Sequence, residues 1–295
     1  MNINNKRLTV FTPTYNRAYI LEQAYNSLLN QTNKSFVWLI IDDGSTDNTE
    51  SLVKKWIKED KIEIKYYKQK NGGKQRAHNK AVKITDTELF ICLDSDDYFT
   101  HDAVELLISK WDKIQDKNKI SGIVALRGLD KQTPIGTWLP TKIKYSPLNK
   151  LYSKYNFRGD TALLFRTNIL EKYPFWVAKD EQFIGEGYVY NQIDQKYQMY
   201  LLNEVIYICK YLDDGYTNNV RKLIKDNPKG YMELNKQAAI YSTSLKERYM
   251  KTIKYMVGFI LSKKSDPFDE FPYKVLAILA YFPALFYWFF KYKNL

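Results

Sequence analysis

The stretch Glu88-Leu-Phe-Ile-Cys-Leu-Asp-Ser-Asp-Asp97 joins a short apolar run to three carboxylates within four residues. The run from Leu89 to Leu93 is too short for an ordinary helix and predicts a buried strand. The acids therefore lie just beyond the carboxyl end of that strand, where open α/β sheets bind their ligands. Adjacent carboxylates repel one another unless a positive group lies among them, and a divalent cation that carries phosphate oxygens meets this need.

Three earlier apolar runs are also followed by polar or glycine-containing turns. The runs cover residues 8–11, 36–41 and 62–67, and their turns read Thr12-Pro-Thr-Tyr-Asn-Arg17, Asp42-Asp-Gly-Ser-Thr-Asp47 and Gln69-Lys-Asn-Gly-Gly-Lys-Gln-Arg-Ala-His-Asn79. In most cases a helical pattern follows the turn, so the alternation predicts βαβ units and a mostly parallel, Rossmann-like α/β sheet flanked by helices. Because every cluster follows its strand, all four are expected along one edge of the sheet, in one shared site.

Composition narrows the class of protein. The chain has 295 residues, 45% of them hydrophobic and 26% charged, which is typical of a folded protein with one large domain and an appendage. The net charge of +12 suggests an anionic partner, but the clustered acids would repel nucleic acid, so no nucleic-acid partner is expected. Cys92 and Cys209 lie in apolar runs and predict buried thiols in a reducing compartment. Residues 1–9 contain no apolar signal segment, so the main domain is expected in the cytoplasm.

Asp94 and Asp96 alternate just after the fourth strand, so both carboxylates can point the same way. One can then face a metal ion and the other a ribose or a second ligand position. A calcium loop of the EF-hand type is excluded, because its sixth position would be Phe99 where a glycine is needed for the sharp turn. A capped helix start is the structural alternative.

The second and third turns carry groups suited to a nucleotide. A carboxylate at Asp42 or Asp43 can accept a hydrogen bond from a base N–H, as in uracil or thymine, although helix capping explains these acids as well. The glycine pair that ends at Gly73 allows close backbone approach. Lys74 and Arg76 then bring positive charge towards a diphosphate. Together these features predict a nucleotide-diphosphate site with a divalent metal.

Four motifs in this order resemble the signatures of family 2 glycosyltransferases with the GT-A fold. They are Thr12-Pro-Thr-Tyr-Asn16, Asp42-Asp-Gly-Ser-Thr-Asp47, Asn71-Gly-Gly with Ala77-x-Asn79, and Asp94-Ser-Asp-Asp97, all in the first hundred residues. The resemblance implies a GT-A catalytic domain over residues 1–215, with a nucleotide-binding half (1–100) and an acceptor-binding half (101–215). A helical region would follow over residues 216–295. It also implies inverting transfer of a sugar from a nucleotide donor, usually UDP-linked, with Mg²⁺ or Mn²⁺ as cofactor.

The resemblance also implies roles for single residues. Pro13, Tyr15 and Asp43 would hold the nucleoside, and Asp94 and Asp96 the ribose and the metal ion. The full expected nucleotide-binding set is Thr12, Pro13, Tyr15, Arg17, Asp42, Asp43, Gly73, Lys74, Arg76, Asn79, Asp94 and Ser95, with Asp96 and Asp94 as the metal ligands.

The reaction needs a carboxylate that removes the proton from the acceptor hydroxyl. The resemblance places this base near the start of a helix after the acceptor-side strand, where Glu186 is the first candidate and Glu181 the second. The family's frequent Glu-Asp pair is absent because Gly187 follows Glu186, and a carboxylate placed against the helix dipole is the alternative. Trp138 and Asp160 are weaker candidates for contacts with the acceptor.

The segment from Val275 to Phe290 is almost wholly apolar and is flanked by lysines. It falls short of the ~20 residues that a spanning helix needs, and Pro283 interrupts it. We expect a helical hairpin or an interfacial anchor on a membrane surface, which places the protein at the inner face of the plasma membrane. A buried packing helix is the alternative.

The function predicted from the sequence is transfer of a sugar to a glycan or lipid-linked acceptor in bacterial-type surface polysaccharide synthesis. A sugar nucleotidyltransferase would share the metal and the fold class, but would carry a glycine-rich basic loop where residues 12–17 stand. A non-catalytic basic module that binds membrane or nucleic acid would leave the clustered acids unexplained.

Overall fold

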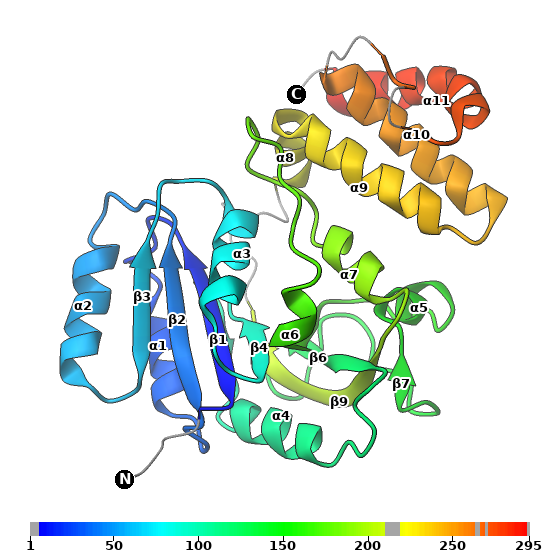
Figure 1. The fold of residues 1–295 in the computed structure, drawn as a ribbon. Coiled ribbons are helices and arrows are strands. Elements are labelled where there is room, and N and C mark those ends of the chain that lie inside the picture. The colour runs from blue at the N-terminus through cyan, green and yellow to red at the C-terminus, as the bar shows by residue number, and fades with distance from the viewer. Residues whose placement is uncertain (1–5, 210–218, 263–265, 269–270, 294–295) are drawn as a thin grey trace. The chain divides into compact units, whose positions relative to one another are not determined.

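The computed structural model describes residues 6–209, 219–262, 266–268 and 271–293 (Figure 1). The chain forms two compact units. The first consists of Met1–Pro174 and Gln192–Lys210, and the second of Phe175–Asn191 and Tyr211–Leu295. The domain boundary expected at residues 215–216 lies outside the described residues.

The first unit is built on one sheet that has nine strands within the described residues. Their order is β3-β2-β1-β4-β8-β6-β9-β5, with β7 paired to β9. The strands are β1 (Leu8–Thr14), β2 (Phe36–Asp42), β3 (Ile64–Lys68), β4 (Leu89–Cys92), β5 (Tyr98–Phe99), β6 (Ile120–Gly128), β7 (Tyr145–Ser146), β8 (Thr161–Arg166) and β9 (Gln198–Ile208).

The first four strands are parallel, as the alternating pattern predicts, with Leu8 of β1 opposite both Phe36 of β2 and Leu89 of β4. The other half of the sheet is mixed, because β8 runs antiparallel to both β4 and β6. A parallel neighbour requires a crossover connection. The chain instead reaches β8 through the long excursion of residues 129–160, so it returns in the opposite direction.

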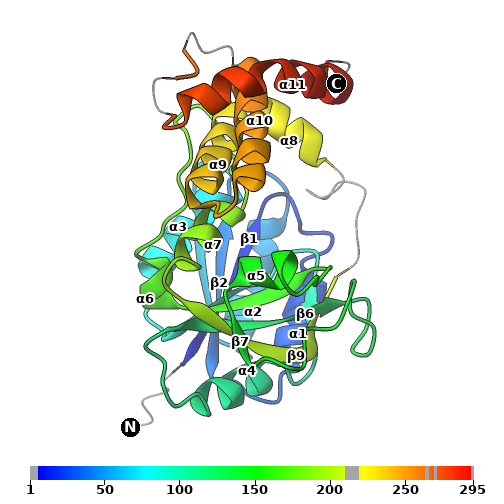
Figure 2. The ribbon, with the colours of Figure 1, turned by 90° about the vertical axis from the view of Figure 1, so that its right-hand side faces the viewer.

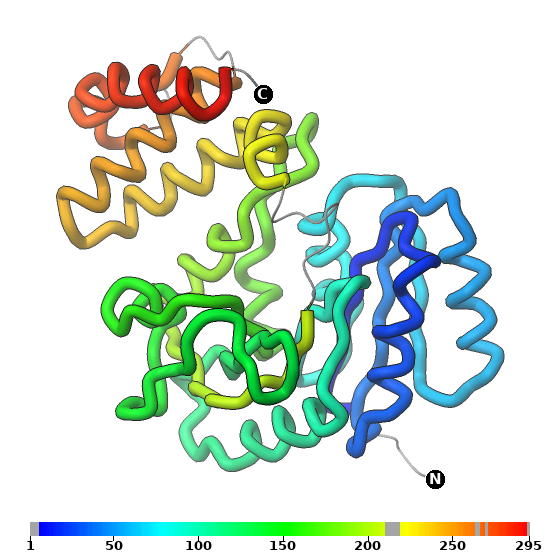
Figure 3. Tube along the Cα trace, turned by 180° about the vertical axis from the view of Figure 1, so that it is seen from behind, coloured from blue at the N-terminus to red at the C-terminus, as the bar shows by residue number. Residues whose placement is uncertain are grey.

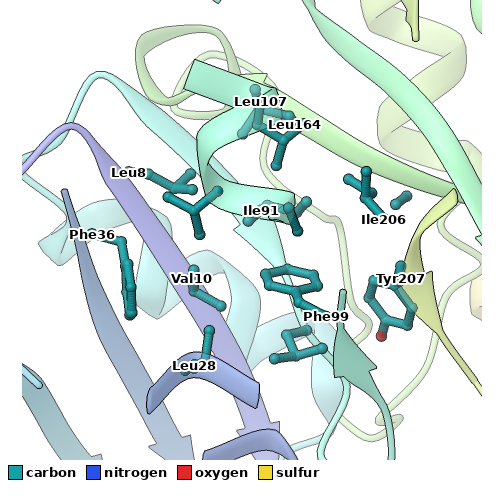
Figure 4. Packing of buried hydrophobic residues seen from close by; sticks show 14 of the residues in the cluster. Leu8, Val10, Leu28, Phe36, Ile91, Phe99, Leu107, Leu164, Ile206 and Tyr207 are labelled. Carbon is teal, nitrogen blue, oxygen red and sulfur yellow. The ribbon is translucent and has the colours of Figure 1, made fainter. Parts of the chain in front are cut away.

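Helices cover both faces of the parallel strands. They are α1 (Glu22–Leu29), α2 (Thr49–Glu59), α3 (Lys74–Ile84) and α4 (Ala103–Asp112). Residues of α1, α2 and α4 share one buried cluster with alternate strand residues such as Val10 and Ile91 (Figure 4). On the opposite face, the His78 ring of α3 meets Phe11 and Phe90 edge-on, at 5.7 and 5.2 Å. Figure 1 shows α3 in front of the strands, and Figure 3, from behind, shows α1 in front.

Shorter helices complete this part of the chain: α5 (Leu148–Ser153), α6 (Thr167–Leu170) and α7 (Gly187–Ile193). Asp194, just after α7, fixes α5. Its carboxylate accepts hydrogen bonds from the backbone N–H groups of Leu148 and Asn149 at 2.8 and 2.7 Å. These two donors belong to the first turn of α5, where backbone N–H groups lack partners inside the helix.

The second unit is helical: α8 (Val220–Asp226), α9 (Pro228–Tyr241), α10 (Leu245–Ser262) and α11 (Lys274–Tyr292). In Figure 2, α9 and α10 lie side by side and α11 packs against α10. The expected apolar tail is one helix, and Pro283 lies inside it without ending it.

Candidate functional site

The turns that follow β1 and β2 are tied together by hydrogen bonds. Asn16 adopts a positive φ of 54°, its N–H donates to the Ser45 hydroxyl at 2.9 Å, and its Oδ1 accepts the Thr46 N–H at 2.8 Å. A further bond joins the same two turns, since the Asp47 carboxylate accepts the Ala18 N–H at 3.0 Å. The two turns are therefore one rigid piece.

Tyr15 stands on this piece with 48% of its surface exposed. An exposed aromatic ring on a rigid turn is a surface on which a flat ligand group can stack.

Asp42 and Asp43 end β2 and have different partners. Asp42 accepts the Ser45 N–H at 2.6 Å and the Tyr66 hydroxyl at 2.5 Å, so it holds its own turn and β3. Asp43 instead reaches the third turn, where it accepts the N–H groups of Gly72 and Gly73 at 2.9 and 2.7 Å. Asp43 therefore fixes the glycine pair beside the second turn.

The third turn is joined to the acids after β4 by an ion pair. Gly73 has a φ of +92°, which L side chains rarely adopt, and it directly precedes α3. Lys74 is the first residue of α3, and its Nζ lies 2.7 Å from Asp94 Oδ1. All four turns are thus linked in sequence along one edge of the sheet, as the spacing of the motifs predicts.

Arg127 of β6 and Tyr207 of β9 hold the acids from the other side. Arg127 Nη1 lies 3.3 Å from Asp94 Oδ2 and 3.6 Å from Asp97 Oδ2. The guanidinium also lies 4.1 Å from the centre of the Tyr207 ring. The Tyr207 hydroxyl accepts the Asp94 N–H at 2.8 Å. Neither residue was expected from the sequence, and a charged side chain inside an apolar strand run was the only signal for Arg127.

The three acids have different electrostatic surroundings. Burial would raise the pKa of Asp94, but Lys74 and Arg127 outweigh it and hold that pKa well below its usual range. Burial and repulsion from Asp94 raise the pKa of Asp96. The same two causes, in the same order, raise the pKa of Asp97 to about 7. Lys74 and Arg127 therefore stabilise the charge of Asp94 more than the charges of Asp96 and Asp97.

The pKa of Asp97 predicts a pH dependence of stability. Because this pKa is raised on folding, the stability that Asp97 contributes is present below its unfolded value near 4 and is lost as pH rises towards 7. Asp97→Asn removes this titration. We expect the melting temperature of the variant, relative to wild type, to rise between pH 5 and pH 8, by roughly 2–4 °C for each kcal/mol. The control is Asp86→Asn, at an exposed carboxylate; equal slopes for the two variants would contradict the assignment.

The Asp96 side chain fits a divalent cation. It is partly exposed, and within the described residues its carboxylate makes no hydrogen bond or ion pair with another side chain. In the described part of the chain, no three His, Cys, Asp or Glu side chains are arranged so that they could hold a metal ion together. Mg²⁺, however, is commonly held by one or two carboxylates together with substrate phosphates. Asp96 therefore suits a metal that arrives with a diphosphate, whereas Asp94 is already paired with Lys74.

The other expected residues occupy the same turns. Arg76 Nη1 donates to the Gly72 carbonyl at 2.8 Å and braces the third turn. Ser95 is buried between the acids. The Thr12 hydroxyl is also buried and accepts the Trp38 indole N–H at 2.9 Å, so it stabilises the core. Half-buried side chains at these turns are those of Pro13, Arg17 and Asn79.

A family model described as Glycosyl transferase family 2 matches residues 9–174, more than half of the chain. The chain belongs to this family. The matched range contains all four turns as well as Arg127. The four sequence motifs typical of the family lie together at one edge of the sheet.

Bacterial proteins are among the relatives of this chain. A Campylobacter jejuni protein named GalNAc(5)-diNAcBac-PP-undecaprenol beta-1,3-glucosyltransferase is 26% identical over 243 residues, which cover 78% of this chain and 73% of that protein. An uncharacterized glycosyltransferase of Rickettsia conorii is 41% identical over 104 residues, 35% of this chain. The chain spans less than a fifth of the length of the rickettsial relatives it matches.

Solved structures confirm the GT-A type of fold. The structure of S. aureus TarS 1–349 has a TM-score of 0.58 at 17% identity and covers 94% of this chain and 90% of that one. A mannosyltransferase from Pyrobaculum calidifontis, in complex with GDP-Man and Mn²⁺, has a TM-score of 0.55 at 17% identity and covers 95% and 80%.

The weaker acceptor candidates, Trp138 and Asp160, lie on two backbone segments that contact each other. Gly136 and Gly159 form a β-bridge, and a Cβ at Gly136 would lie 2.0 Å from the Arg158 carbonyl oxygen. Trp138 is 48% exposed beside this bridge. The backbone carbonyl of Asp160 accepts the Arg127 N–H at 3.2 Å. Both candidates are therefore carried by segments that lie side by side, and the Asp160 segment is bonded to the strand that carries Arg127.

The two candidate bases, Glu186 and Glu181, belong to the second unit and differ in their hydrogen bonds. Glu186 directly precedes α7, is half-buried, and accepts the Tyr190 hydroxyl at 3.4 Å. Glu181 is buried, and its two oxygens accept the N–H groups of Lys229 and Gly230 at 2.7 Å each. Both donors lie in the first turn of α9, so Glu181 caps that helix.

Glu181→Gln is expected to lower the stability of the enzyme. An amide presents one donor where the helix offers only N–H groups, so one buried N–H loses its acceptor at a cost of about 1–3 kcal/mol. Thermal unfolding should show a lower melting temperature than for the exposed control Glu171→Gln. An unchanged melting temperature would show that the cap contributes nothing to stability.

Proposed function

We propose that this glycosyltransferase moves a sugar from a UDP-sugar to a hydroxyl of a glycan or lipid-linked acceptor, with inversion. The observation that carries the proposal is the linkage of four turns through Asp43 and the Lys74–Asp94 ion pair. It presents an aromatic ring, positive charge and a carboxylate to one ligand.

The proposed roles in donor binding follow from this linkage. The exposed ring of Tyr15 stacks on the base. Asp43 accepts N–H groups of Gln69, Gly72 and Gly73 through both of its oxygens, and an N–H of the base would replace the longest of these bonds, the one of 3.1 Å from Gly72 to Oδ2. Lys74 and Arg17 face the diphosphate.

The chemical step is proposed as a single displacement. Glu186 accepts the proton of the acceptor hydroxyl as that oxygen attacks the anomeric carbon, and the nucleoside diphosphate leaves from the opposite side. Asp96 would hold Mg²⁺ or Mn²⁺, and a bound metal supplies stabilisation of the charge on the diphosphate. Arg127 and Tyr207 keep Asp94 in place beside this carboxylate.

The nature of the acceptor is proposed from two observations. The Campylobacter jejuni relative is named for an undecaprenol-linked substrate. The apolar helix α11 would bring the enzyme to the surface where such substrates reside. We therefore propose that the enzyme works at the inner face of the plasma membrane, in the synthesis of a surface glycan.

A donor panel tests the proposed function. Wild-type enzyme is incubated with UDP-, GDP- and dTDP-sugars in the presence of Mn²⁺, and the released products are separated. The proposal expects UDP to be released from one UDP-sugar. Release of pyrophosphate would indicate a nucleotidyltransferase, and no release of nucleotide from any donor would contradict the proposal.

A further inference from the structure

Helix α11 buries a row of small side chains and exposes many of its large apolar ones. Ala277, Ala280 and Ala284 are fully buried against the rest of the second unit. Seven large apolar side chains of this helix are exposed by 49–79% of their surface; they are Val275, Ile278, Leu279, Phe282, Phe286, Phe289 and Phe290. We name these seven residues the α11 apolar face.

The α11 apolar face is one continuous stripe. Its members recur at intervals of three and four residues, which places them along one side of a helix. Charged residues do not occur between positions 275 and 290. A helix that packs in a soluble core normally turns its large apolar side chains inward. A contiguous exposed apolar patch of this kind marks a surface that binds a membrane, another protein or a ligand.

The charges at the ends of α11 indicate what covers the face. Lys274 precedes it and Lys291 and Lys293 follow it, and all three lysines are exposed. If a second copy of the chain covered the face, lysines would meet lysines at the ends in either a parallel or an antiparallel alignment. An anionic lipid leaflet attracts the lysines at both ends and accepts the apolar side chains between them.

The packing of α11 distinguishes a helix that lies on a membrane from one that crosses it. By length and hydropathy alone, α11 is long and apolar enough to cross a membrane. Its alanine side, however, packs in a cluster with Ile253 and Val257 of α10, and the Tyr249 hydroxyl bonds the Leu279 carbonyl at 3.1 Å. A crossing helix would draw α10 into the bilayer together with Lys246, Glu247, Arg248 and Lys251 of that helix.

We propose that the α11 apolar face inserts into the interface of an anionic membrane leaflet, with the helix axis parallel to the membrane plane. The Phe and Leu side chains enter the acyl boundary, and the three lysines contact lipid phosphates. The purpose of this membrane contact rests on the proposed function, because only a lipid-linked acceptor requires the enzyme to work at the membrane surface.

Vesicle sedimentation tests the surface without any turnover. The full chain is mixed with vesicles of phosphatidylglycerol and phosphatidylcholine, or of phosphatidylcholine alone. We expect at least about tenfold stronger binding to the anionic vesicles, weakened by high salt. Phe282→Ser with Phe286→Ser should lower this binding at least about tenfold. The matched control is Ile57→Ser with Ile84→Ser, two exposed apolar residues of the first unit, which should bind like wild type.

Three outcomes would overturn the proposal. Wild-type protein that stays in the supernatant, or a double Phe variant that binds like wild type, removes the face as a membrane contact. A wild-type dimer that the same variant converts to a monomer, without vesicle binding, assigns the face to a second copy. Because sedimentation needs no donor, a failed donor panel with intact vesicle binding would contradict only the proposed function.

The orientation of the helix has its own measurement. Lys274→Cys and Lys293→Cys are each labelled from outside the vesicles with a membrane-impermeant maleimide, and labelling of wild type is subtracted. A helix in the membrane plane exposes both ends on one side, so both variants should be labelled. Labelling of only one variant would show that α11 crosses the bilayer and would contradict the parallel orientation.

Discussion

Asp96→Ala is expected to lower kcat/KM for sugar transfer with Mn²⁺ by a factor on the order of 10³ or more, because stabilisation of the leaving diphosphate by a metal is worth several kcal/mol. Among the described residues, no side chain makes a hydrogen bond or ion pair with the Asp96 carboxylate, and burial together with repulsion from Asp94 raises its pKa. A cation relieves that repulsion. Steady-state kinetics across a Mn²⁺ titration measures the effect.

The matched control for this variant is Asp86→Ala, which removes an exposed carboxylate from the same unit. It should retain wild-type kinetics. The melting temperature of Asp96→Ala should stay near the wild-type value, since in the described part of the chain the Asp96 carboxylate makes no hydrogen bond or ion pair with another side chain. Normal turnover of Asp96→Ala with Mn²⁺ would refute the metal assignment.

Glu186→Gln is expected to leave UDP binding intact and to lower kcat by a factor of roughly 10²–10⁴, the usual contribution of a general base. Gln keeps the size of the side chain and can still meet the Tyr190 hydroxyl, but it cannot accept the proton of the acceptor. Calorimetry with UDP and a transfer assay on the same preparation separate binding from chemistry.

Two variants serve as controls for the base. Glu171→Gln changes an exposed carboxylate and should behave like wild type. Glu181→Gln should lose stability through the cap of α9 while retaining most of its kcat. If Glu186→Gln transferred sugar at the wild-type rate and Glu181→Gln did not, the base would be Glu181.

The four turns were predictable because each follows a short apolar strand and carries its own chemistry. Asp43, Lys74 and Asp94 lie after three different strands, yet the parallel arrangement of those strands brings them into contact. The partners within that contact were less predictable. The sequence does not indicate that Asp43 bonds a glycine pair or that Thr12 turns into the core.

Arg127 and Tyr207 could not be placed from the sequence. They are 33 and 113 positions from Asp94, and they reach it because β8 returns antiparallel and lets β6 and β9 join the same sheet. That topology depends on how the long excursion of residues 129–160 folds, and the excursion has no regular hydrophobic pattern. The residues that balance the acids were therefore missed, although the acids themselves were found.

Helix α11 shows a similar limit. Hydropathy identified an apolar segment, but hydropathy alone does not say which side of a helix faces the protein. The three alanines at positions 277, 280 and 284 were the available signal, since small residues at this spacing let two helices approach closely. Pro283 was expected to interrupt the helix, yet α11 continues through it.

The most direct test of the whole account is a crystal structure of the wild-type enzyme with UDP and Mn²⁺, with the metal located by anomalous scattering. The account predicts a manganese peak on the Asp96 carboxylate, a diphosphate beside Lys74, and a uracil ring on Tyr15 with its N–H towards Asp43. A manganese peak away from Asp96, or UDP bound outside the four linked turns, would contradict it.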